Sequence, residues 1–208
     1  MADTNKVKFG ISNAYYALLT LGNDGTATYG TPKKFPGSVN LSLSPQGDIS
    51  PFYADNIVYY QSGANAGYSG TWEVAKLTDD FKKDVLGYVE DSNGVLLEDA
   101  DAEVAPFALL FQIDGDAHNR RHVLYNCAAS RPELNASTIT DTKEPATDSI
   151  PITCASVYND SLRKNFVKGS CSPTDAAYST WFTEVYQTGG EQSTPQVATS
   201  SGSAGSIT

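Results

Sequence analysis

The sequence is poor in the residues that most often carry catalysis, metal binding or covalent cross-links. Its 208 residues include three cysteines and two histidines. The cysteine count is odd, and the first ten residues lack the apolar core of a secretory signal. Both facts argue against a disulfide framework. We therefore expect Cys127 and Cys154, which lie in alternating apolar runs, to be small buried hydrophobic residues.

Positive charge and long apolar runs are also scarce. Lys and Arg together number 14 against 24 Asp and Glu, which gives a net charge of −10. Binding to nucleic-acid phosphates or to anionic lipids requires clustered Lys and Arg, so this balance argues against both kinds of surface. The longest apolar run, residues 104–111, includes a proline and is far shorter than the roughly 20 residues that cross a bilayer.

Motifs of the common enzyme classes are missing from the sequence. It has no glycine-rich phosphate loop and no serine in a nucleophile elbow. Glycosidases hold two carboxyl groups at a set separation across a cleft. The paired carboxylates of this chain at residues 98–103 are instead close sequence neighbours, which is typical of a solvated loop; they are Glu98, Asp99, Asp101 and Glu103.

One cluster has the residue types of a metal site. It contains Asp114, Asp116, His118 and His122, and carboxylates and imidazoles are common metal ligands. In an extended chain the Cα atoms of the two histidines would lie about 13 Å apart, too far to share one ion easily. We therefore interpret the cluster as an exposed hairpin tip with Asp-Gly turn chemistry, and we predict no metal and no other cofactor.

Short strand patterns separated by turn residues make up most of the chain. The alternation of Val39, Leu41 and Leu43 with polar residues predicts a half-buried strand. Residues 106–113 are apolar on both faces, which predicts a central strand. Regularly spaced short strands predict a mostly β fold, an antiparallel β-sandwich or barrel. Further strands are expected at residues 7–12, 56–60, 68–75, 121–129, 149–157 and 164–170.

The sequence also predicts how individual residues lie in two of these strands. Alternation places Val123, Tyr125 and Cys127 on one side of their strand. Pro151 cannot donate a ladder hydrogen bond, so it should sit near a strand start or on a sheet edge.

Two short helices are predicted to flank the sheet. Residues 77–87 have Thr78 as a helix N-cap, acidic residues in the first turn, and Gly87 as a terminator. Residues 172–186 have Ser172 as a cap before a proline, followed by apolar residues at a spacing of four, Ala177, Trp181 and Val185.

The end of the chain differs in composition from the rest. Residues 188–208 are almost all small or polar, so they cannot bury enough apolar surface to order themselves. We expect one domain at residues 1–187 and a low-complexity tail at residues 188–208.

The stretch from Ser50 to Val74 combines aromatic residues with a glycine-rich segment. Tyr59 and Tyr60 are consecutive, so in a strand one of them faces away from the core. Tyrosine suits a surface that becomes an interface, because its body is apolar and its tip polar. Residues 62–67, SGANAG, are expected to form a flexible loop that orders against another subunit. This combination favours an assembly protein over an enzyme.

Several motifs occur in a characteristic order across residues 6–186. They are KVKFGISNAYYALL, FPGSVNLSLSPQGDISPFYADNIVYY, GYSGTWEVA, DDFKKDVLG, PFALLFQIDGD, RHVLYNCAASRP and WFTEVY. In these motifs the sequence resembles the major tail proteins, or tail tube proteins, of long non-contractile-tailed bacteriophages (siphophages) of Gram-positive bacteria. The arrangement FYADN, YY, GYSG is the most specific part of the resemblance.

The resemblance implies a structural virion protein that is not an enzyme. Its β-sandwich or barrel, flanked by a helix, would form hexameric rings that stack into the tail tube, and strands from six subunits would line a continuous barrel. A long loop would contact the next ring, and DNA would pass through the lumen transiently and without sequence preference. The partners would be further copies of the chain and the tape measure, tail terminator and baseplate proteins, with no membrane. Assembly would take place in the cytoplasm of the host bacterium.

Under this interpretation the aromatic stretch is an inter-subunit element. The expected contact residues are Phe52, Tyr53, Tyr59, Tyr60, Gly63, Ala64, Asn65, Gly67 and Tyr68. An acidic lumen would repel DNA phosphates, and the candidate lining residues are Asp48, Asp55 and Glu73.

Two alternatives from other classes remain open. The first is a monomeric ligand- or sugar-binding β-sandwich module, in which the tyrosines would form a stacking platform inside a concave site. The second is a small metal-dependent enzyme.

Overall fold

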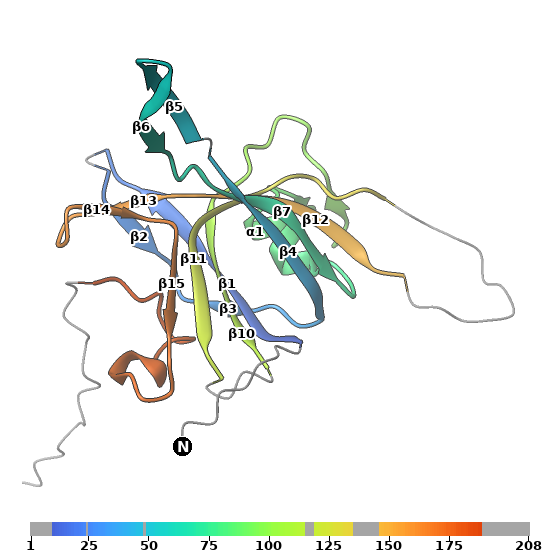
Figure 1. Ribbon diagram of the computed structural model, residues 1–208. Coiled ribbons are helices and arrows are strands. Elements are labelled where there is room, and N and C mark those ends of the chain that lie inside the picture. The colour runs from blue at the N-terminus through green and yellow to red at the C-terminus, as the bar shows by residue number, and fades with distance from the viewer. Residues whose placement is uncertain (1–9, 24, 48, 115–118, 135–145, 189–208) are drawn as a thin grey trace, which may run out of the picture.

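The computed structural model describes residues 10–23, 25–47, 49–114, 119–134 and 146–188 (Figure 1). This part of the chain is mostly antiparallel β structure with short helical segments, which confirms the predicted fold class. No helix within it is long and apolar enough to span a bilayer. The elements are β1 (Ile11–Leu21), β2 (Ala27–Tyr29), β3 (Lys33–Lys34), β4 (Ser38–Gln46), β5 (Ile49–Ala54), β6 (Ile57–Gly63), β7 (Gly67–Val74), α1 (Asp79–Asp84), β8 (Val89–Glu90), β9 (Leu96–Leu97), β10 (Phe107–Ile113), β11 (Arg121–Ala129), β12 (Asp148–Ala155), β13 (Val157–Asn159), β14 (Lys164–Phe166), β15 (Lys168–Cys171) and the 3₁₀ helix η1 (Ala176–Tyr178).

One large sheet organises the molecule. Its strands follow the order β2-β1-β10-β11-β12-β7-β4, with β3 added beside β1 and β15 beside β11. The sheet curves, because β4 at one end of this order contacts β1 near the other end. Three hairpins, β5–β6, β8–β9 and β13–β14, form separate two-stranded sheets.

The central strands are buried on both faces. Phe107 and Leu109 of β10 pack into one cluster with Trp72 and the α1 residue Phe81. Leu110, on the opposite face of β10, packs into a second cluster with residues of the C-terminal segment, among them Trp181 and Val185. Strand β10 is therefore central, as its two apolar faces predict.

Helix α1 forms where the sequence predicts it. The Thr78 hydroxyl accepts a hydrogen bond from the Phe81 amide at 3.4 Å, and Gly87 has a φ of +73°, in the left-handed region that favours glycine after a helix. Asp84 ties the helix to the sheet by accepting hydrogen bonds from Lys33 Nζ at 2.6 Å and Tyr16 Oη at 2.7 Å. Partial burial raises the pKa of Asp84, but these two donors outweigh that effect and hold the pKa below its usual value.

The prediction of a second helix at residues 172–186 is wrong. Residues 172–186 contain the short η1 and turns, and Ser172 is not the cap, because η1 begins at Ala176 with Asp175 at its N-cap position. In a helix the Tyr178 carbonyl would accept the amide of Phe182. That carbonyl instead accepts the Trp181 amide, in a tighter turn, and the Arg121 guanidinium, while the Phe182 ring stacks on Tyr15 at 4.8 Å. Contacts with the sheet thus override the helical spacing.

Strand bulges explain two errors of alternation. Val39 is the extra residue in the pairing of β4 with β7, and it is exposed rather than half-buried with Leu41 and Leu43. An extra residue in β11, opposite β10, shifts the phase after Tyr125. Val123 and Tyr125 therefore contact the second cluster, whereas Cys127 lies in the first.

The remaining strand predictions need less change. The first strand is predicted at residues 7–12, of which residues 7–9 lie outside the described part. The observed strand β1 continues to Leu21, and sequence alternation does not reveal this extension because both faces of β1 carry apolar residues. Cys127 and Cys154 are buried free thiols that face each other across β11 and β12, as expected of small hydrophobic residues. Strand β12 lies inside the sheet, so Pro151 is not on an edge: it is the fourth residue of the strand and pairs with Thr71 of β7. Toward β11 it stands just beyond the last pair, where its carbonyl accepts the Ser130 amide at 2.8 Å.

Candidate assembly surface

The β5–β6 hairpin projects from the body of the molecule (Figure 1). Its strands pair from Ile49 opposite Gly63 to Ala54 opposite Ile57. The turn consists of Asp55 and Asn56, with φ values of +53° and +61°. Two consecutive positive φ values are typical of a type I′ hairpin turn, and Asp and Asn tolerate them better than most residues.

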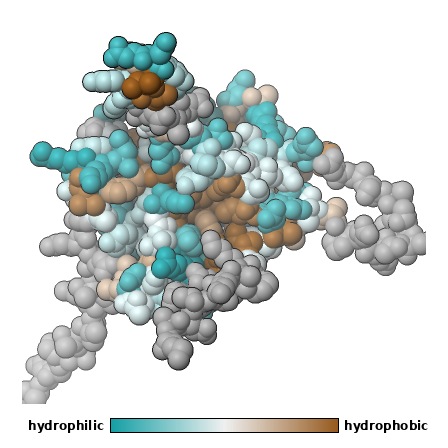
Figure 2. Space-filling model, viewed as in Figure 1, coloured by the Kyte–Doolittle hydropathy of each residue, from teal (hydrophilic) through white to brown (hydrophobic). Residues whose placement is uncertain are grey.

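The hairpin exposes large apolar side chains on both faces. A bulge at Tyr59 interrupts the pairing between Phe52 opposite Tyr60 and Tyr53 opposite Val58. The exposed fractions of these side chains run from 44% to 71%. Figure 2 shows a hydrophobic patch on this projection at the top of the view. The large apolar side chains that the hairpin exposes are those of six residues, Phe52, Tyr53, Ile57, Val58, Tyr59 and Tyr60.

A projecting hairpin with this much exposed apolar surface is unusual for a protein that stays monomeric. A two-stranded hairpin is marginally stable alone in water, and soluble monomers seldom expose contiguous apolar patches without a binding role. We expected one of Tyr59 and Tyr60 to face the core, but both are exposed, because the hairpin stands clear of the body.

The glycine-rich segment at residues 62–67 forms the base of the hairpin and not its tip. The Ala66 amide donates to the Gln46 carbonyl at 2.9 Å, and the Gly67 amide donates to Asn65 Oδ1 at 3.1 Å. A Cβ on Gly67 would lie 1.9 Å from the Cys154 carbonyl oxygen. These contacts argue against a loop that reaches far from the body here, and the turn at Asp55 is the tip of the projection. That residues 62–67 order against another subunit stays a prediction.

The predicted contact residues fall into two groups. Phe52, Tyr53, Tyr59 and Tyr60 lie on the projection, where they are accessible to another molecule. Tyr68 belongs to the body: it packs against the first cluster, and the Lys168 ammonium lies 4.9 Å from its ring centre. The other predicted contacts, Gly63, Ala64, Asn65 and Gly67, lie at the base. Whether any of them touches a second subunit stays a prediction.

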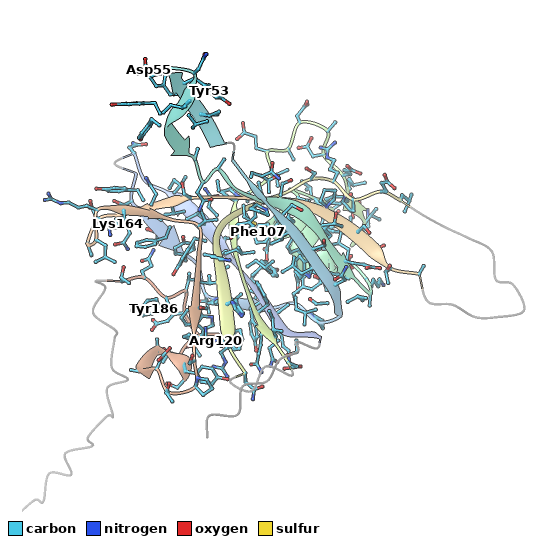
Figure 3. All side chains as sticks on the ribbon, viewed as in Figure 1. Tyr53, Asp55, Phe107, Arg120, Lys164 and Tyr186 are labelled. Carbon is cyan, nitrogen blue, oxygen red and sulfur yellow. The ribbon has the colours of Figure 1, made fainter. Side chains whose placement is uncertain are left out.

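Of the three predicted lumen acids, the two that the structure describes lie on different elements. Asp55 is at the tip of the hairpin, away from the body in Figure 3. Glu73 lies within β7 of the main sheet and accepts a 2.5 Å hydrogen bond from the Thr147 hydroxyl. Asp48 lies outside the described residues. An acidic lumen stays a prediction.

Strand β4 provides a second exposed feature. In the described residues it pairs with β7 alone and so forms an edge of the large sheet. Its residues, Ser38–Gln46, include no charged side chain, although charges are a common means of blocking an edge. The bulge at Val39 and the proline at position 45 limit pairing near its two ends, which leaves residues 40–44 open to a partner strand.

The predicted metal cluster falls partly outside the described residues, because Asp116 and His118 are not among them. Of the other two, Asp114 accepts a hydrogen bond from Gln112 Nε2 at 3.2 Å, and the His122 ring stacks on Phe111 at 5.3 Å. The described residues contain no group of three or more metal-ligating side chains.

The acidic run at residues 98–103 forms an exposed loop, as predicted. The Arg131 side chain fastens it by an ion pair with Glu98 at 3.2 Å and a hydrogen bond to the Asp99 carbonyl at 2.8 Å. These contacts account for the run as a structural feature.

The sequence did not point to a cavity of about 590 Å³ beside the β13–β14 hairpin. Its lining residues come from six separate elements, β2, β11, β13, β14, β15 and η1, and from the segment after η1. No single stretch of the sequence gathers them, so only their aromatic character could have suggested the cavity. Burial raises the pKa of one lining residue, Tyr125, to about 12.

Comparisons with known proteins give little guidance. No protein-family model matches the chain. No curated protein matches it either. Among solved structures, it is similar to the anti-feeding prophage cap, described as a tube-terminating cap, with 10% sequence identity and a TM-score of 0.42 over 83% of this chain and 97% of that one. So weak a likeness carries no conclusion about function.

Proposed function

We propose that this chain is a structural subunit of a bacteriophage tail tube, which self-assembles into stacked hexameric rings around a channel for DNA. The observation that carries the proposal is the β5–β6 hairpin, with six large apolar side chains exposed on a projection. The uncharged edge of β4 supports it, because edges can be removed by pairing within a closed ring. The other parts of the proposal, which are the family, the hexameric ring and the passage of DNA, are what the motif resemblance of residues 6–186 implies.

The leading alternative loses part of its basis. A sugar-binding module would need Tyr53, Tyr59 and Tyr60 around a concave site. They lie instead on a projection with a two-residue tip. The alternative now depends on the cavity beside β13–β14 and no longer on this stretch.

Assembly can be tested by weakening the hairpin alone. Phe52→Ser combined with Tyr60→Ser removes two opposed aromatic rings from an exposed pair, so the monomer should stay folded while ring and tube formation is lost. The measurements are light scattering coupled to size exclusion over a concentration series, and negative-stain microscopy with and without a tail initiator complex.

A matched control removes exposed apolar groups elsewhere. Val89→Ser combined with Leu97→Ser changes an opposed, exposed pair on the β8–β9 hairpin, and this variant should assemble like the wild type. Wild-type protein that stays monomeric at every concentration, even with the initiator, would refute the proposed function. Normal tubes from the Phe52 and Tyr60 variant would instead show that the hairpin is not the contact.

A further inference from the structure

Aromatic side chains form one third of the lining of the cavity beside β13–β14, six of its 18 residues. It lies between that hairpin, β15, β2 and the C-terminal segment up to Thr188, and its volume is about 590 Å³. This volume is within the range of roughly 300–1,000 Å³ that is typical of ligand pockets. The aromatic lining residues are Tyr29, Tyr125, Tyr158, Phe166, Trp181 and Tyr186.

Several contacts hold the cavity in shape. Trp181 stacks on Tyr186 at 5.7 Å and donates from its indole nitrogen to the His122 carbonyl at 3.3 Å. Asn159 Nδ2 donates to the Thr188 carbonyl at 3.2 Å, which joins the β13–β14 hairpin to the end of the described chain. A Cβ on Gly169 would come within 2.9 Å of the Tyr125 hydroxyl, so only glycine leaves that ring its present position.

Two polar groups in the lining have no partner. The hydroxyls of Tyr29 and Thr188 are buried, and neither has a hydrogen-bond partner among the described residues. Burial also raises the pKa of Tyr29, so its hydroxyl stays protonated at neutral pH and can donate. Buried polar groups are nearly always hydrogen-bonded in native proteins, so an occupant with polar atoms as well as apolar surface would complement these two groups.

We propose that the cavity receives the tip of the β5–β6 hairpin of a second copy of this chain. The inference rests on the proposed function, since it assigns the acceptor for the projecting hairpin. One molecule thus carries both an aromatic projection and an aromatic recess, and Tyr53 at the projection stands well apart from Tyr186 at the recess in Figure 3. Such a pair on separate surfaces makes a heterologous, head-to-tail contact, which generates rings or stacks rather than a closed two-fold dimer.

The size of the projection fits this role. Each aromatic side chain buries about 150–250 Å², and the four on the hairpin are 60% to 71% exposed. Docking them would remove on the order of 500 Å² of surface from water, more than half of the roughly 800 Å² per partner in a standard interface. Aromatic anchors that fill a pocket are the usual hot spots of such contacts.

The polar groups and the charges are also complementary. The tip offers the Asn56 amide and the tyrosine hydroxyls as partners for Tyr29 and Thr188. Asp55 is the one charged residue in residues 49–63. The β13–β14 hairpin beside the cavity carries Arg163 in its turn and the outward-pointing Lys164 at the start of β14, with one acid, Asp160, in the turn; the two charged lining residues, Lys168 and Asp175, are of opposite sign.

Complementary variants test this contact directly. A cavity variant, Tyr158→Ser with Leu162→Ser, changes two lining residues that are 46% and 50% exposed, so it should stay folded. The hairpin variant is Phe52→Ser with Tyr60→Ser. Each should assemble at least tenfold less than the wild type at equal concentration. A one-to-one mixture should give dimers that grow no further, because each dimer uses the one intact hairpin and the one intact cavity.

The outcomes separate the two proposals. A wild-type chain that never assembles refutes the proposed function. A wild type that forms tubes, together with a cavity variant that also does so or a mixture that stays monomeric, overturns only the hairpin-to-cavity contact.

A cross-link identifies the occupant. Tyr158 is replaced by the photo-cross-linking amino acid p-benzoylphenylalanine in assemblies that mix isotopically light and heavy chains. Cross-links between chains to residues 51–60 support the contact. Cross-links within one chain to residues 189–208 would show that the protein's own tail fills the cavity. The absence of any protein cross-link would point to a small ligand such as a saccharide. Either of these last two results overturns the inference.

Discussion

Strand β10 and the β5–β6 hairpin both carry large apolar side chains, but in opposite environments. Residues 107–110 of β10 are fully buried, whereas the apolar side chains of the hairpin are 44% to 71% exposed. The difference comes from pairing: β10 has a neighbouring strand on each side and a cluster on each face, while β5 and β6 pair only with each other in the described residues. Apolar content therefore predicts that a surface will be covered, but not whether its own chain or another one covers it.

The largest expected effect contrasts one phenylalanine from each region. Phe107→Ala should lower the free energy of unfolding by about 3–5 kcal/mol, because it leaves a cavity in a close-packed cluster. Phe52→Ala should change it by no more than about 0.5 kcal/mol in the monomer, because its ring packs on little else. Urea unfolding at a concentration where both variants are monomeric measures the difference. Equal losses would show that the hairpin folds against the body.

A second contrast lies at the base of the hairpin. Gly67→Ala should destabilise the protein by more than about 1 kcal/mol, because φ is +99° and the new Cβ would meet the Cys154 carbonyl. Gly63→Ala is the control: its φ is ordinary and nothing lies within 4 Å, so it should be neutral or stabilise by up to about 1 kcal/mol. Thermal unfolding should separate the variants by a few degrees. A tolerated alanine at position 67 would restore the flexible-loop interpretation of residues 62–67.

The smallest expected effect decides between two roles for Asp55. If the hairpin tip docks beside Lys164, Asp55→Lys should weaken assembly by about 0.2–1 kcal/mol per contact, mainly at low salt, and Lys164→Asp should restore it. If Asp55 lines the channel, Asp55→Lys tubes should form normally but eject DNA more slowly at low ionic strength, because lysine attracts phosphate. Sedimentation of tubes and single-particle ejection rates against salt distinguish the two roles. Unchanged behaviour in both assays would remove Asp55 from either role.

The sequence by itself determined the β class, the central position of β10, helix α1 with its Thr78 cap, and the buried character of Cys127 and Cys154. These features depend on local periodicity and on capping chemistry, which a single stretch of chain carries in full. The sequence also marked residues 50–74 as unusual, because consecutive tyrosines cannot all face one core.

Only the tertiary structure decided the bulges, the fate of residues 172–186 and the position of the hairpin. A bulge at Val39 depends on pairing with β7, a strand that follows about 30 residues later. Residues 172–186 do not form a helix because they contact Arg121 and Tyr15, which lie far from them in the sequence. The aromatic cavity likewise joins Tyr29 to Tyr186. Each of these features comes from contacts between segments that are distant in the sequence. A local sequence pattern does not specify which distant segment a given stretch will pack against.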